Sequence, residues 1–167
     1  MEYNPYALTG KTILVTGASS GIGRAVAIEC SRLGAHVILS ARNKEKLEET
    51  LKMMEGHGHQ VIECDLSKEK EVSLLIDEVP EIQGLVNNAG TTMTVPVPFI
   101  KFNVLSDLLK VNTIAPIMIL SGLVKKKKLR ANSSVVFTSS VSGLGRVSPG
   151  NTMYAATKGA VCLLYTS

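Results

Sequence analysis

The sequence predicts an α/β protein built on a doubly wound parallel sheet. Short apolar runs alternate with amphipathic helix-like segments along the whole chain. The apolar runs are continuous, as in strands whose two faces are both covered by helices. A length of 167 residues, with 45% hydrophobic and 19% charged residues, suits one folded domain with a substantial core. We therefore expect residues 1–167 to form a single domain.

The first half of the chain contains three successive strand–helix units. Gly34 marks the end of the first helix, in which Ile22, Val26 and Leu33 are among the predicted inward positions. Asn43 is suited to cap the second helix. The predicted strands span residues 11–17, 35–41 and 59–65, and the predicted helices span residues 21–34, 43–56 and 67–79.

The second half continues the alternation. It contains strands at 82–90 and 133–140, a long helix at 101–128 interrupted by Pro116, and a helix that begins at 151. Right-handed crossovers between parallel strands place their carboxyl ends along one edge of the sheet, which is where such folds bind ligands.

The positive charge of the chain is concentrated in one segment. The net charge is +4, and "KKKKLR", residues 125–130, supplies five of the 18 basic residues. The remainder has 13 basic and 14 acidic residues. A lysine run can bind nucleic acid, an anionic membrane or an acidic carrier protein. No aromatic residue is interleaved to stack on bases, so we interpret the run as a solvated helix C-terminus. We expect neither a nucleic-acid nor a membrane partner, since the longest apolar stretch, 114–124, is too short to span a bilayer.

The cysteines and histidines indicate no disulfide and no metal site. Cys30, Cys64 and Cys162 are odd in number, far apart and form no CxxC pair, which favours reduced thiols in a cytoplasmic protein. His57 and His59 flank a glycine in a predicted surface turn, and we expect no metal ligand among them.

A glycine-rich segment, "TGASSGIG" at residues 16–23, follows the first predicted strand. Gly17 can take the tight turn out of the strand, and Gly21 and Gly23 allow close approach of a pyrophosphate and of the helix. Because this segment opens a helix in an alternating α/β chain, it predicts nucleotide binding. No Gly-Lys-Ser/Thr follows, which excludes a Walker loop.

Residues at the next strand ends refine the predicted cofactor. A site for NAD would place an acid after the second strand, to bind the ribose 2′-hydroxyl. Arg42 stands there instead and suits the 2′-phosphate of NADPH, so NAD is the less favoured alternative. Asp65 either contacts the adenine edge or caps the next helix beside Ser67. "NNAG", residues 87–90, supplies a buried Asn that can tie neighbouring loops and a Gly that lets backbone pass close to a ligand.

Tyr154 and Lys158 are four residues apart at the start of the last helix. Residues at this spacing share one face of a helix, so the phenol and the ammonium can occupy one site. A free tyrosine has a pKa of about 10 and is a poor base at neutral pH. A fixed cation favours the phenolate, so the pair is a candidate acid/base centre.

In combination, these motifs resemble the classical short-chain dehydrogenase/reductase family over residues 8–161. A glycine loop follows strand one, "NNAG" follows strand four, a serine pair follows strand five, and Tyr-x-x-x-Lys opens the next helix. The resemblance implies a three-layer Rossmann-type fold and an NADPH-dependent carbonyl reductase, similar to 3-oxoacyl-carrier-protein reductases. The implied cofactor-binding residues are Thr16, Gly17, Ser19, Ser20, Gly21, Ile22, Gly23, Arg42, Asp65, Asn88, Ala89, Gly90, Tyr154 and Lys158.

The same resemblance implies a catalytic tetrad. Tyr154 would protonate the carbonyl oxygen while Lys158 favours its phenolate form and holds the nicotinamide ribose. Ser140 would bind the substrate oxygen, with Ser139 as an alternative, because Ser140 has the family's Ser-x-x-Gly spacing. Asn112 would complete the tetrad. Pro116 cannot donate to the Asn112 carbonyl, which would be free to hold a relay water; a simple helix kink is the other interpretation.

Members of this family continue for roughly a hundred residues beyond the lysine, through further strands and a substrate lid. We therefore expect a C-terminally truncated chain that lacks the last strands of the fold and has little or no activity of its own. Its last residues, "CLLYTS", fit the family pattern less well. The resemblance further implies a homo-oligomer at full length, with contacts through the helices that begin at 101 and 151.

The substrate class stays open, with a small-molecule carbonyl or alcohol as the expectation. The predicted substrate-side segments are residues 91–99 and 144–153. Two alternatives to a reductase remain. One is a non-catalytic nucleotide-binding module. The other is an extended-type sugar-nucleotide epimerase, although that class favours a different glycine spacing from that of Gly17 and Gly21.

Overall fold

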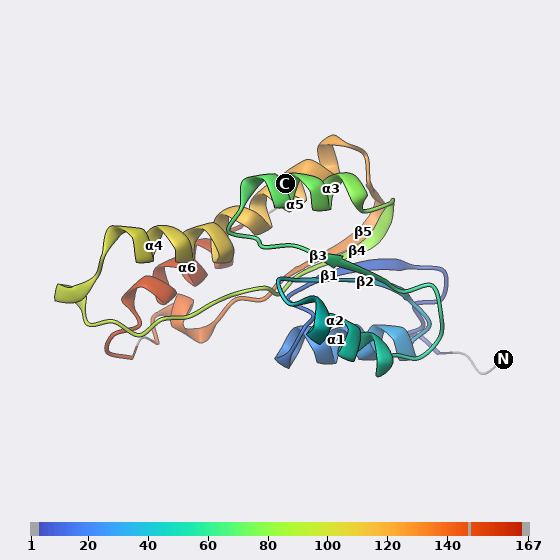
Figure 1. The fold of residues 1–167 in the computed structure, drawn as a ribbon, viewed down its shortest axis with the longest axis horizontal. Helices are drawn as coiled ribbons and strands as arrows, with labels where there is room; N and C mark the ends of the chain where they lie inside the picture. Colours follow the sequence, from blue (N-terminus) through green and yellow to red (C-terminus); the bar gives the residue numbers. More distant parts are fainter. Residues whose placement is uncertain (1–3, 147, 165–167) are drawn as a thin grey trace.

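The computed structural model describes residues 4–146 and 148–164, and these residues contain the predicted parallel sheet (Figure 1). Five strands lie in the order β3-β2-β1-β4-β5, and every neighbouring pair is parallel. The chain winds outward from β1 to β3 and then returns to place β4 on the other side of β1, so the order reverses between β1 and β4. The strands are Thr12–Thr16 (β1), His36–Ala41 (β2), Gln60–Glu63 (β3), Ile82–Asn87 (β4) and Leu129–Phe137 (β5).

Helices cover both faces of the sheet, which confirms the predicted doubly wound architecture. Figure 1 shows α1 and α2 on one face and α3 and α5 on the other, while α4 and α6 pack against each other beyond the sheet. The helices are Gly21–Arg32 (α1), Lys44–Lys52 (α2), Glu69–Glu78 (α3), Phe102–Leu109 (α4), Ala115–Lys125 (α5) and Thr152–Cys162 (α6); short 3₁₀ turns span Val97–Phe99 (η1) and Val141–Leu144 (η3), and a π-helical turn spans Lys110–Ile114 (η2).

The strands send alternate side chains into two separate cores. Leu14 packs with residues of α3 and α5, including Leu75 and Ile119. Val15, the next residue, packs with residues of the other layer, including Leu47 of α2. All four leucine and isoleucine side chains are at most 1% exposed, and burial of one such side chain contributes about 1.5–3 kcal/mol. The two cores therefore hold the strand ends rigidly at the edge where a ligand is expected.

The predicted boundaries of the first two helices are confirmed in part, because α1 ends near Gly34 and Asn43 caps α2, but α2 ends at Lys52, four residues before its predicted end at residue 56. Gly34 follows α1 with a φ of 91°, and the Asn43 side chain accepts a hydrogen bond from the N–H of Lys46 at 2.8 Å. The predicted inward position of Ile22 is wrong, because this side chain is 65% exposed. The buried face of α1 instead begins at Gly23 and continues every fourth residue, which turns the preceding Ile22 toward solvent.

The predicted interruption of the long helix is confirmed, but it lies one turn before the proline. α4 and α5 are joined by the π-helical turn η2, in which the N–H of Ala115 bonds the Lys110 carbonyl, and Pro116 lies in the first turn of α5. Because Pro116 has no N–H to continue the α-helical ladder, the wider turn accommodates the missing bond.

The continuous helical segment from Phe102 to Lys125 is longer than the apolar stretch considered above. It has 24 residues, and an 18-residue window within it has a mean hydropathy of 1.5, enough in length and composition to cross a membrane. The apolar stretch 114–124 is thus one part of a longer helix that meets these two criteria. Ala115, Ile119 and Leu123 of the same segment are buried in the core against α3 and the sheet. A core helix of a soluble protein passes the same hydropathy test.

The basic run "KKKKLR" begins at the end of α5; two of its cations contact the end of α3, and a third contacts the loop between α3 and β4. Lys128 Nζ donates to the carbonyls of Ile76, Asp77 and Val79 at 2.9, 2.6 and 2.6 Å. Lys126 pairs with the Asp77 carboxylate, and Arg130 Nε lies 2.6 Å from Glu81 Oε2. Cations at the carbonyl end of a helix complement its dipole. These contacts support the interpretation of the run as cations at a helix C-terminus. The run follows α5, but it also caps the C-terminus of α3.

β5 begins four residues before its predicted start and ends at Phe137. Ser139 and Ser140 therefore lie in the loop after the strand, at the sheet edge that carries the other strand ends. Two predictions fall partly outside the described residues. They are residue 147 of the substrate-side segment 144–153, and residues 165–167 of "CLLYTS".

Candidate active site

Thr16 links the carboxyl ends of β1 and β4. Its buried Oγ1 accepts hydrogen bonds from the N–H groups of Asn88 and Ala89, both at 3.1 Å. Asn88 Nδ2 donates to the Thr16 carbonyl at 3.2 Å, and Asn88 Oδ1 accepts from Thr138 Oγ1, just beyond β5, at 3.3 Å. Three neighbouring strand ends are thus fixed relative to one another.

The glycine-rich loop passes so close to the end of β4 that it has no room for side chains at two positions. A Cβ at Gly23 would lie 2.3 Å from the Gly17 carbonyl oxygen, and one at Gly17 would lie 2.8 Å from Ala89 Cα. Gly17 also has a φ of 69°, in the left-handed region that favours glycine. A Cβ at Gly21, by contrast, would meet nothing within 4 Å, so the loop is open on that side.

The first turn of α1 presents N–H groups without a competing partner. Ser20 is the N-cap residue, but its side chain makes no capping hydrogen bond, and no acid lies in the first turn. The first N–H groups of a helix have no partner within the helix and carry the positive end of its dipole. This turn, with the exposed Ile22 beside it, is suited to bind an anion such as phosphate.

A cleft of about 470 Å³ runs past the carboxyl ends of β1 to β4. Eight predicted cofactor-binding residues line it: Gly17, Ser19, Ser20, Arg42, Asp65, Asn88, Ala89 and Gly90. Six others do not line it: Thr16, Gly21, Ile22, Gly23, Tyr154 and Lys158. Thr16 and Gly23 are buried, Gly21 and Ile22 are exposed at the start of α1, and Tyr154 and Lys158 lie on α6, beyond the Gly90 end of the cleft.

Two cations stand on the wall of the cleft that α2 forms. Arg42 follows β2 as predicted, and Lys46 lies on the first turn of α2. Both side chains belong to exposed residues, and neither forms an ion pair within residues 4–146 and 148–164. The sequence analysis missed Lys46. Its position, four residues after Arg42 and three after the helix cap, is the signal that could have identified it.

Asp65 forms the turn before α3 and also lines the cleft. Its Oδ1 accepts from the Ser67 N–H at 3.0 Å and the Ser67 hydroxyl at 2.8 Å, in the turn that precedes α3. Burial by itself would raise the Asp65 pKa, but the Ser67 hydrogen bonds, with Lys68 and Arg42 nearby, lower it overall. The sequence suggested that Ser67 caps α3, but the N-cap residue of this helix is Lys68. Asp65 therefore stabilises a turn while it also lines the cleft.

Lys158 is a buried cation whose one hydrogen bond within the described residues goes to a neutral group. It is 4% exposed, and its Nζ donates to the Thr138 carbonyl at 2.7 Å. No carboxylate pairs with it in the described part of the chain. Burial lowers the pKa of Lys158, and the nearby Cys162 thiol opposes this shift only in part. The ammonium is thus available to stabilise a negative charge that develops beside it.

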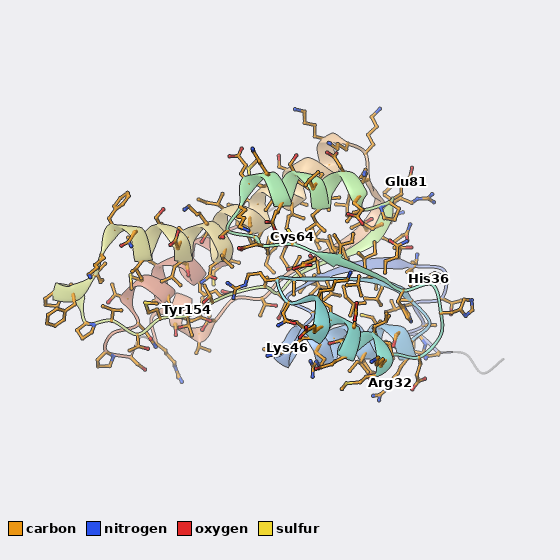
Figure 2. All side chains as sticks on the ribbon, in the orientation of Figure 1. Arg32, His36, Lys46, Cys64, Glu81 and Tyr154 are labelled. Atoms are coloured by element: carbon orange, nitrogen blue, oxygen red, sulfur yellow. The ribbon has the colours of Figure 1, made fainter. Side chains whose placement is uncertain are left out.

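Tyr154 lies one helical turn before Lys158, and the lysine Nζ is 6.0 Å from the centroid of its ring. The ring is half-buried at the end of the molecule that α4 and α6 form, away from Lys46 in the first half of the chain (Figure 2). A Cβ at Gly90 would lie 3.4 Å from Lys158 Nζ. Gly90 therefore connects the cleft with the Tyr154–Lys158 pair.

Asn112 lies in the π-helical turn and is fully bonded through its side chain. Its Oδ1 accepts from the Thr91 N–H at 2.8 Å, and its Nδ2 donates to the Thr91 carbonyl at 2.8 Å and to Thr157 Oγ1 at 3.0 Å. The neighbouring Thr113 donates to the Thr157 carbonyl at 3.1 Å. These contacts join the segment after β4 to η2 and to α6, directly before Lys158.

The two candidate serines are distinguished by their contacts. Ser139 Oγ lies 3.1 Å from the Lys158 carbonyl and 2.7 Å from Cys162 Sγ, so it packs against α6. Ser140 Oγ accepts from the Ser142 N–H at 3.2 Å and makes no other hydrogen bond to the described residues. A Cβ at Gly143 would lie 2.7 Å from the Lys158 carbonyl carbon, which explains why glycine is required there for η3 to pack on α6. Ser140 is the serine with a hydroxyl proton free to donate.

Of the two asparagines in "NNAG", Asn88 makes the predicted loop-tying contacts and Asn87 does not. Asn87 is 4% exposed, yet neither its Oδ1 nor its Nδ2 has a hydrogen-bond partner in the described structure. The other contacts that sequence reasoning missed are those of Thr138 and Thr157. Both are ordinary polar residues whose partners are distant in the sequence.

The cysteines and the other metal-ligating side chains do not form a cluster. Cys30, Cys64 and Cys162 are free thiols. Burial, with the nearby Glu71 and Asp65, raises the pKa of Cys64 to about 12, so this thiol is protonated at neutral pH. Within residues 4–146 and 148–164, no three His, Cys, Asp or Glu side chains stand close enough to hold a metal ion.

Several known proteins are similar to this chain in sequence. The model of the short chain dehydrogenase family matches residues 11–167. The chain is 34% identical to a 3-oxoacyl-[acyl-carrier-protein] reductase of Rickettsia felis, over 90% of this chain and 62% of that protein. It is 35% identical to 3-ketodihydrosphingosine reductase of Mus musculus, over 94% of this chain and 50% of that protein. The chain thus spans between half and two thirds of the length of these relatives.

Solved structures of similar proteins have the same arrangement of elements. A short chain dehydrogenase from Escherichia coli CFT073, complexed with NADPH, matches with a TM-score of 0.82 and 34% identity, over 93% of this chain and 69% of that one. The Pseudomonas aeruginosa RhlG/NADP active-site complex matches with a TM-score of 0.85 and 27% identity, over 95% of this chain and 66% of that one. The chain belongs to the short-chain dehydrogenase family.

Proposed function

We propose that the protein to which these residues belong is an NAD(P)-dependent oxidoreductase that reduces a carbonyl to an alcohol, or catalyses the reverse reaction, with NADPH as the preferred cofactor. The observation that carries this proposal is the buried Lys158, which has no carboxylate partner among the described residues and lies on the same helix face as Tyr154. A buried cation without a counter-ion is costly, and it is expected where it serves the chemistry of a site.

The roles of the site residues follow from their chemistry. A nicotinamide cofactor, when bound, would supply the hydride for the carbonyl carbon. Tyr154 donates its phenolic proton to the carbonyl oxygen, and the Lys158 ammonium stabilises the resulting phenolate. Ser140 donates a hydrogen bond to the same oxygen, which holds it in line with Tyr154. Carbonyl, hydride and proton together give the alcohol.

Asn112 acts through its position. Its side chain joins the backbone of Thr91 to Thr157, so it fixes α6 and the chain after Gly90 in relation to each other. Its backbone carbonyl, four residues before Pro116, is our candidate for holding a water that returns a proton to Lys158 and Tyr154.

The cleft holds the other end of the cofactor. The N–H groups of the first turn of α1 bind the pyrophosphate, and Asp65 faces the adenine. Arg42 and Lys46 bind the 2′-phosphate that distinguishes NADPH from NADH. Bound NADPH and NADP in the two solved relatives support this choice of cofactor.

The substrate we would test first is a 3-oxoacyl compound. The two curated relatives described above are named as reductases of 3-oxoacyl-carrier-protein and 3-ketodihydrosphingosine. The predicted substrate-side segments, residues 91–99 and 144–153, would carry the side chains that select among ketones. A homo-oligomer in the cytoplasm is part of the proposal. The exposed Ile114, Ile117 and Met118 support contacts through the long helix, and the free thiols support a reducing compartment.

Tyr154→Phe in the full-length protein tests the mechanism. Loss of the phenolic proton should lower kcat for ketone reduction by about 10²- to 10⁴-fold with little change in the KM for NADPH. The matched control is Tyr6→Phe, since Tyr6 is 75% exposed and distant in sequence from the site. Unchanged turnover by the Tyr154→Phe protein would remove the proposed mechanism.

The 167 residues alone should bind the cofactor and turn over little or no ketone. Their cleft is lined at every strand end from β1 to β4, whereas the relatives have a third or more of their length beyond the matched part. A spectrophotometric assay with NADPH and a panel of ketones measures this directly. Sustained turnover by the 167-residue chain would contradict the expectation of inactivity.

A further inference from the structure

Two side chains outside the glycine-rich loop bind the back of that loop. Arg24 Nη2, from α1, donates to the Ser19 carbonyl at 2.6 Å, and Arg24 Nε donates to Thr50 Oγ1, from α2, at 3.0 Å. Thr50 is fully buried, and its Oγ1 lies 3.0 Å from the Ala18 carbonyl. Glu49 Oε2 completes the cluster at 3.3 Å from Arg24 Nη2.

These contacts determine which way the loop presents its N–H groups. A trans peptide is planar, so a carbonyl and the N–H of the following residue point in opposite directions. The carbonyls of Ala18 and Ser19 are directed toward Thr50 and Arg24. The N–H groups of Ser19 and Ser20 must therefore point the other way. Both residues line the cleft on that side.

The same cluster ties the loop to α2. Thr50 Oγ1 also lies 3.0 Å from the Lys46 carbonyl, one turn earlier on the helix. Lys46 and Arg42 are the cations that line the cleft on the α2 side. A ligand that carries both a pyrophosphate and a more distant phosphate needs a site whose N–H donors and cations are held at a fixed separation. This cluster sets the separation between the loop N–H groups and the cations of the α2 side.

We infer that Arg24 and Thr50 are positioning residues for the cofactor. They orient the N–H groups of the loop toward the pyrophosphate and hold the loop in register with the cations of α2. Neither side chain lines the cleft itself. The inference rests on the proposed function, because it takes a dinucleotide phosphate as the ligand of the loop.

Thr50→Val and Arg24→Met in the 167-residue chain test the inference by calorimetric titration with NADPH. Each removes one direct hydrogen bond to the loop, and each should raise the Kd about five- to tenfold. Thr50→Ser keeps the hydroxyl and should stay within about twofold of the unmodified chain. The matched control is Ser31→Ala. Ser31 is a buried hydroxyl that links α1 to the segment after α2, at the far end of the same helix pair.

A second measurement separates positioning from mere stability. Amide hydrogen exchange at Gly17 and Ala18, whose N–H groups bond the Ser40 carbonyl, should accelerate in Thr50→Val and Arg24→Met, but not in Ser31→Ala, even where all three melt at similarly reduced temperatures. If the unmodified chain binds NADPH and the Thr50 and Arg24 variants bind it equally well, the inference is overturned while the proposed function stands. If the unmodified chain shows no binding, the proposed function fails, and this inference fails with it.

Discussion

The two ends of the candidate site are built in different ways. At the α1–α2 end, the groups that would meet a ligand are exposed cations and backbone N–H groups, and the side chains behind them keep that surface open. At the α4–α6 end, the key groups are buried and bonded to one another, as in the chain of contacts from Thr91 through Asn112 and Thr157 to α6. The α1–α2 end is suited to bind the negatively charged groups of a ligand. The α4–α6 end is suited to hold Lys158 and Tyr154 at fixed positions relative to each other.

This difference predicts where each end is vulnerable. The ligand-receiving end should lose affinity when its backbone is displaced or its cations are removed, with modest effects on chemistry. The buried end should lose turnover when a single polar group is replaced, with modest effects on cofactor affinity.

Lys158→Met should have the largest effect on turnover. In the full-length protein, loss of the ammonium removes the stabilisation of the phenolate, and we expect kcat to fall by about 10²- to 10⁴-fold. The matched control is Lys110→Met, which removes an exposed cation that pairs with Asp107 on the same side of the molecule. A turnover loss of equal size in both variants would show that Lys158 has no special place in the chemistry.

The pH dependence of stability tests the burial of the same lysine. Because burial lowers the Lys158 pKa below its ordinary value of 10.5, the folded chain holds this proton less tightly than the unfolded chain does. The buried ammonium therefore lowers the free energy of unfolding. This loss is present in full at pH values below the Lys158 pKa of the folded chain, and it disappears as the pH rises to 10.5. Urea titrations measure the free energy of unfolding of Lys158→Met and of the unmodified chain. The value for Lys158→Met minus the value for the unmodified chain should decrease as the pH rises through that window. A pH-independent difference would contradict the assignment.

Gly23→Ala should have the largest effect on cofactor binding. The new Cβ would lie 2.3 Å from the Gly17 carbonyl oxygen, so the loop or α1 must move, at a cost of about 1–3 kcal/mol and at least a tenfold rise in the Kd for NADPH. The same substitution at Gly159, in α6, meets its nearest atom at 3.5 Å and should leave the Kd unchanged. Equal binding by the two alanine variants would mean that the loop is not held against β4.

Arg42→Ala should change the choice of cofactor. We expect about a tenfold loss in the affinity for NADPH and little change for NADH, since only the former carries the 2′-phosphate. Arg32→Ala is the control, because Arg32 is an exposed cation of α1 that pairs with Glu29 and Glu55. If Arg42→Ala lowers the affinity for NADPH and for NADH equally, Arg42 does not distinguish a 2′-phosphate from a 2′-hydroxyl.

The smallest effects compare the two adjacent asparagines. Asn88→Ala removes the side-chain hydrogen bonds to Thr16 and Thr138 and should lower the free energy of unfolding by about 1–3 kcal/mol. Asn87→Ala removes an amide with no partner in the described structure and should cost under about 1 kcal/mol. Thermal unfolding of both variants measures the difference. A larger loss at Asn87 would reveal a partner for its amide.

Local patterns predicted most of the fold. The apolar runs located all five strands, and the Asn43 cap and Gly34 gave correct helix boundaries because each works through its own neighbours in the chain. Ile22 was misplaced because hydrophobicity suggested an inward position, whereas the geometry at the start of α1 buries Gly23 instead. The π-helical turn before Pro116 also escaped prediction, since the sequence shows the missing N–H but not how the helix accommodates it.

The site was predictable only where a motif fixes the spacing. The glycine loop, Arg42 and the Tyr154–Lys158 pair follow from short-range patterns. Contacts such as Arg24 with Thr50, or Lys158 with the Thr138 carbonyl, join residues 20 or more positions apart and carry no local signature. They depend on the packing of whole elements, so the structure was needed to find them.

The most direct test of the account is a calorimetric titration of the 167-residue chain with NADPH and with NADH under identical conditions. We predict saturable binding of one cofactor molecule per chain, about tenfold tighter for NADPH, because the open N–H groups and the two cations of the cleft meet different phosphates of the same ligand. Absence of saturable binding, or tighter binding of NADH, would contradict it.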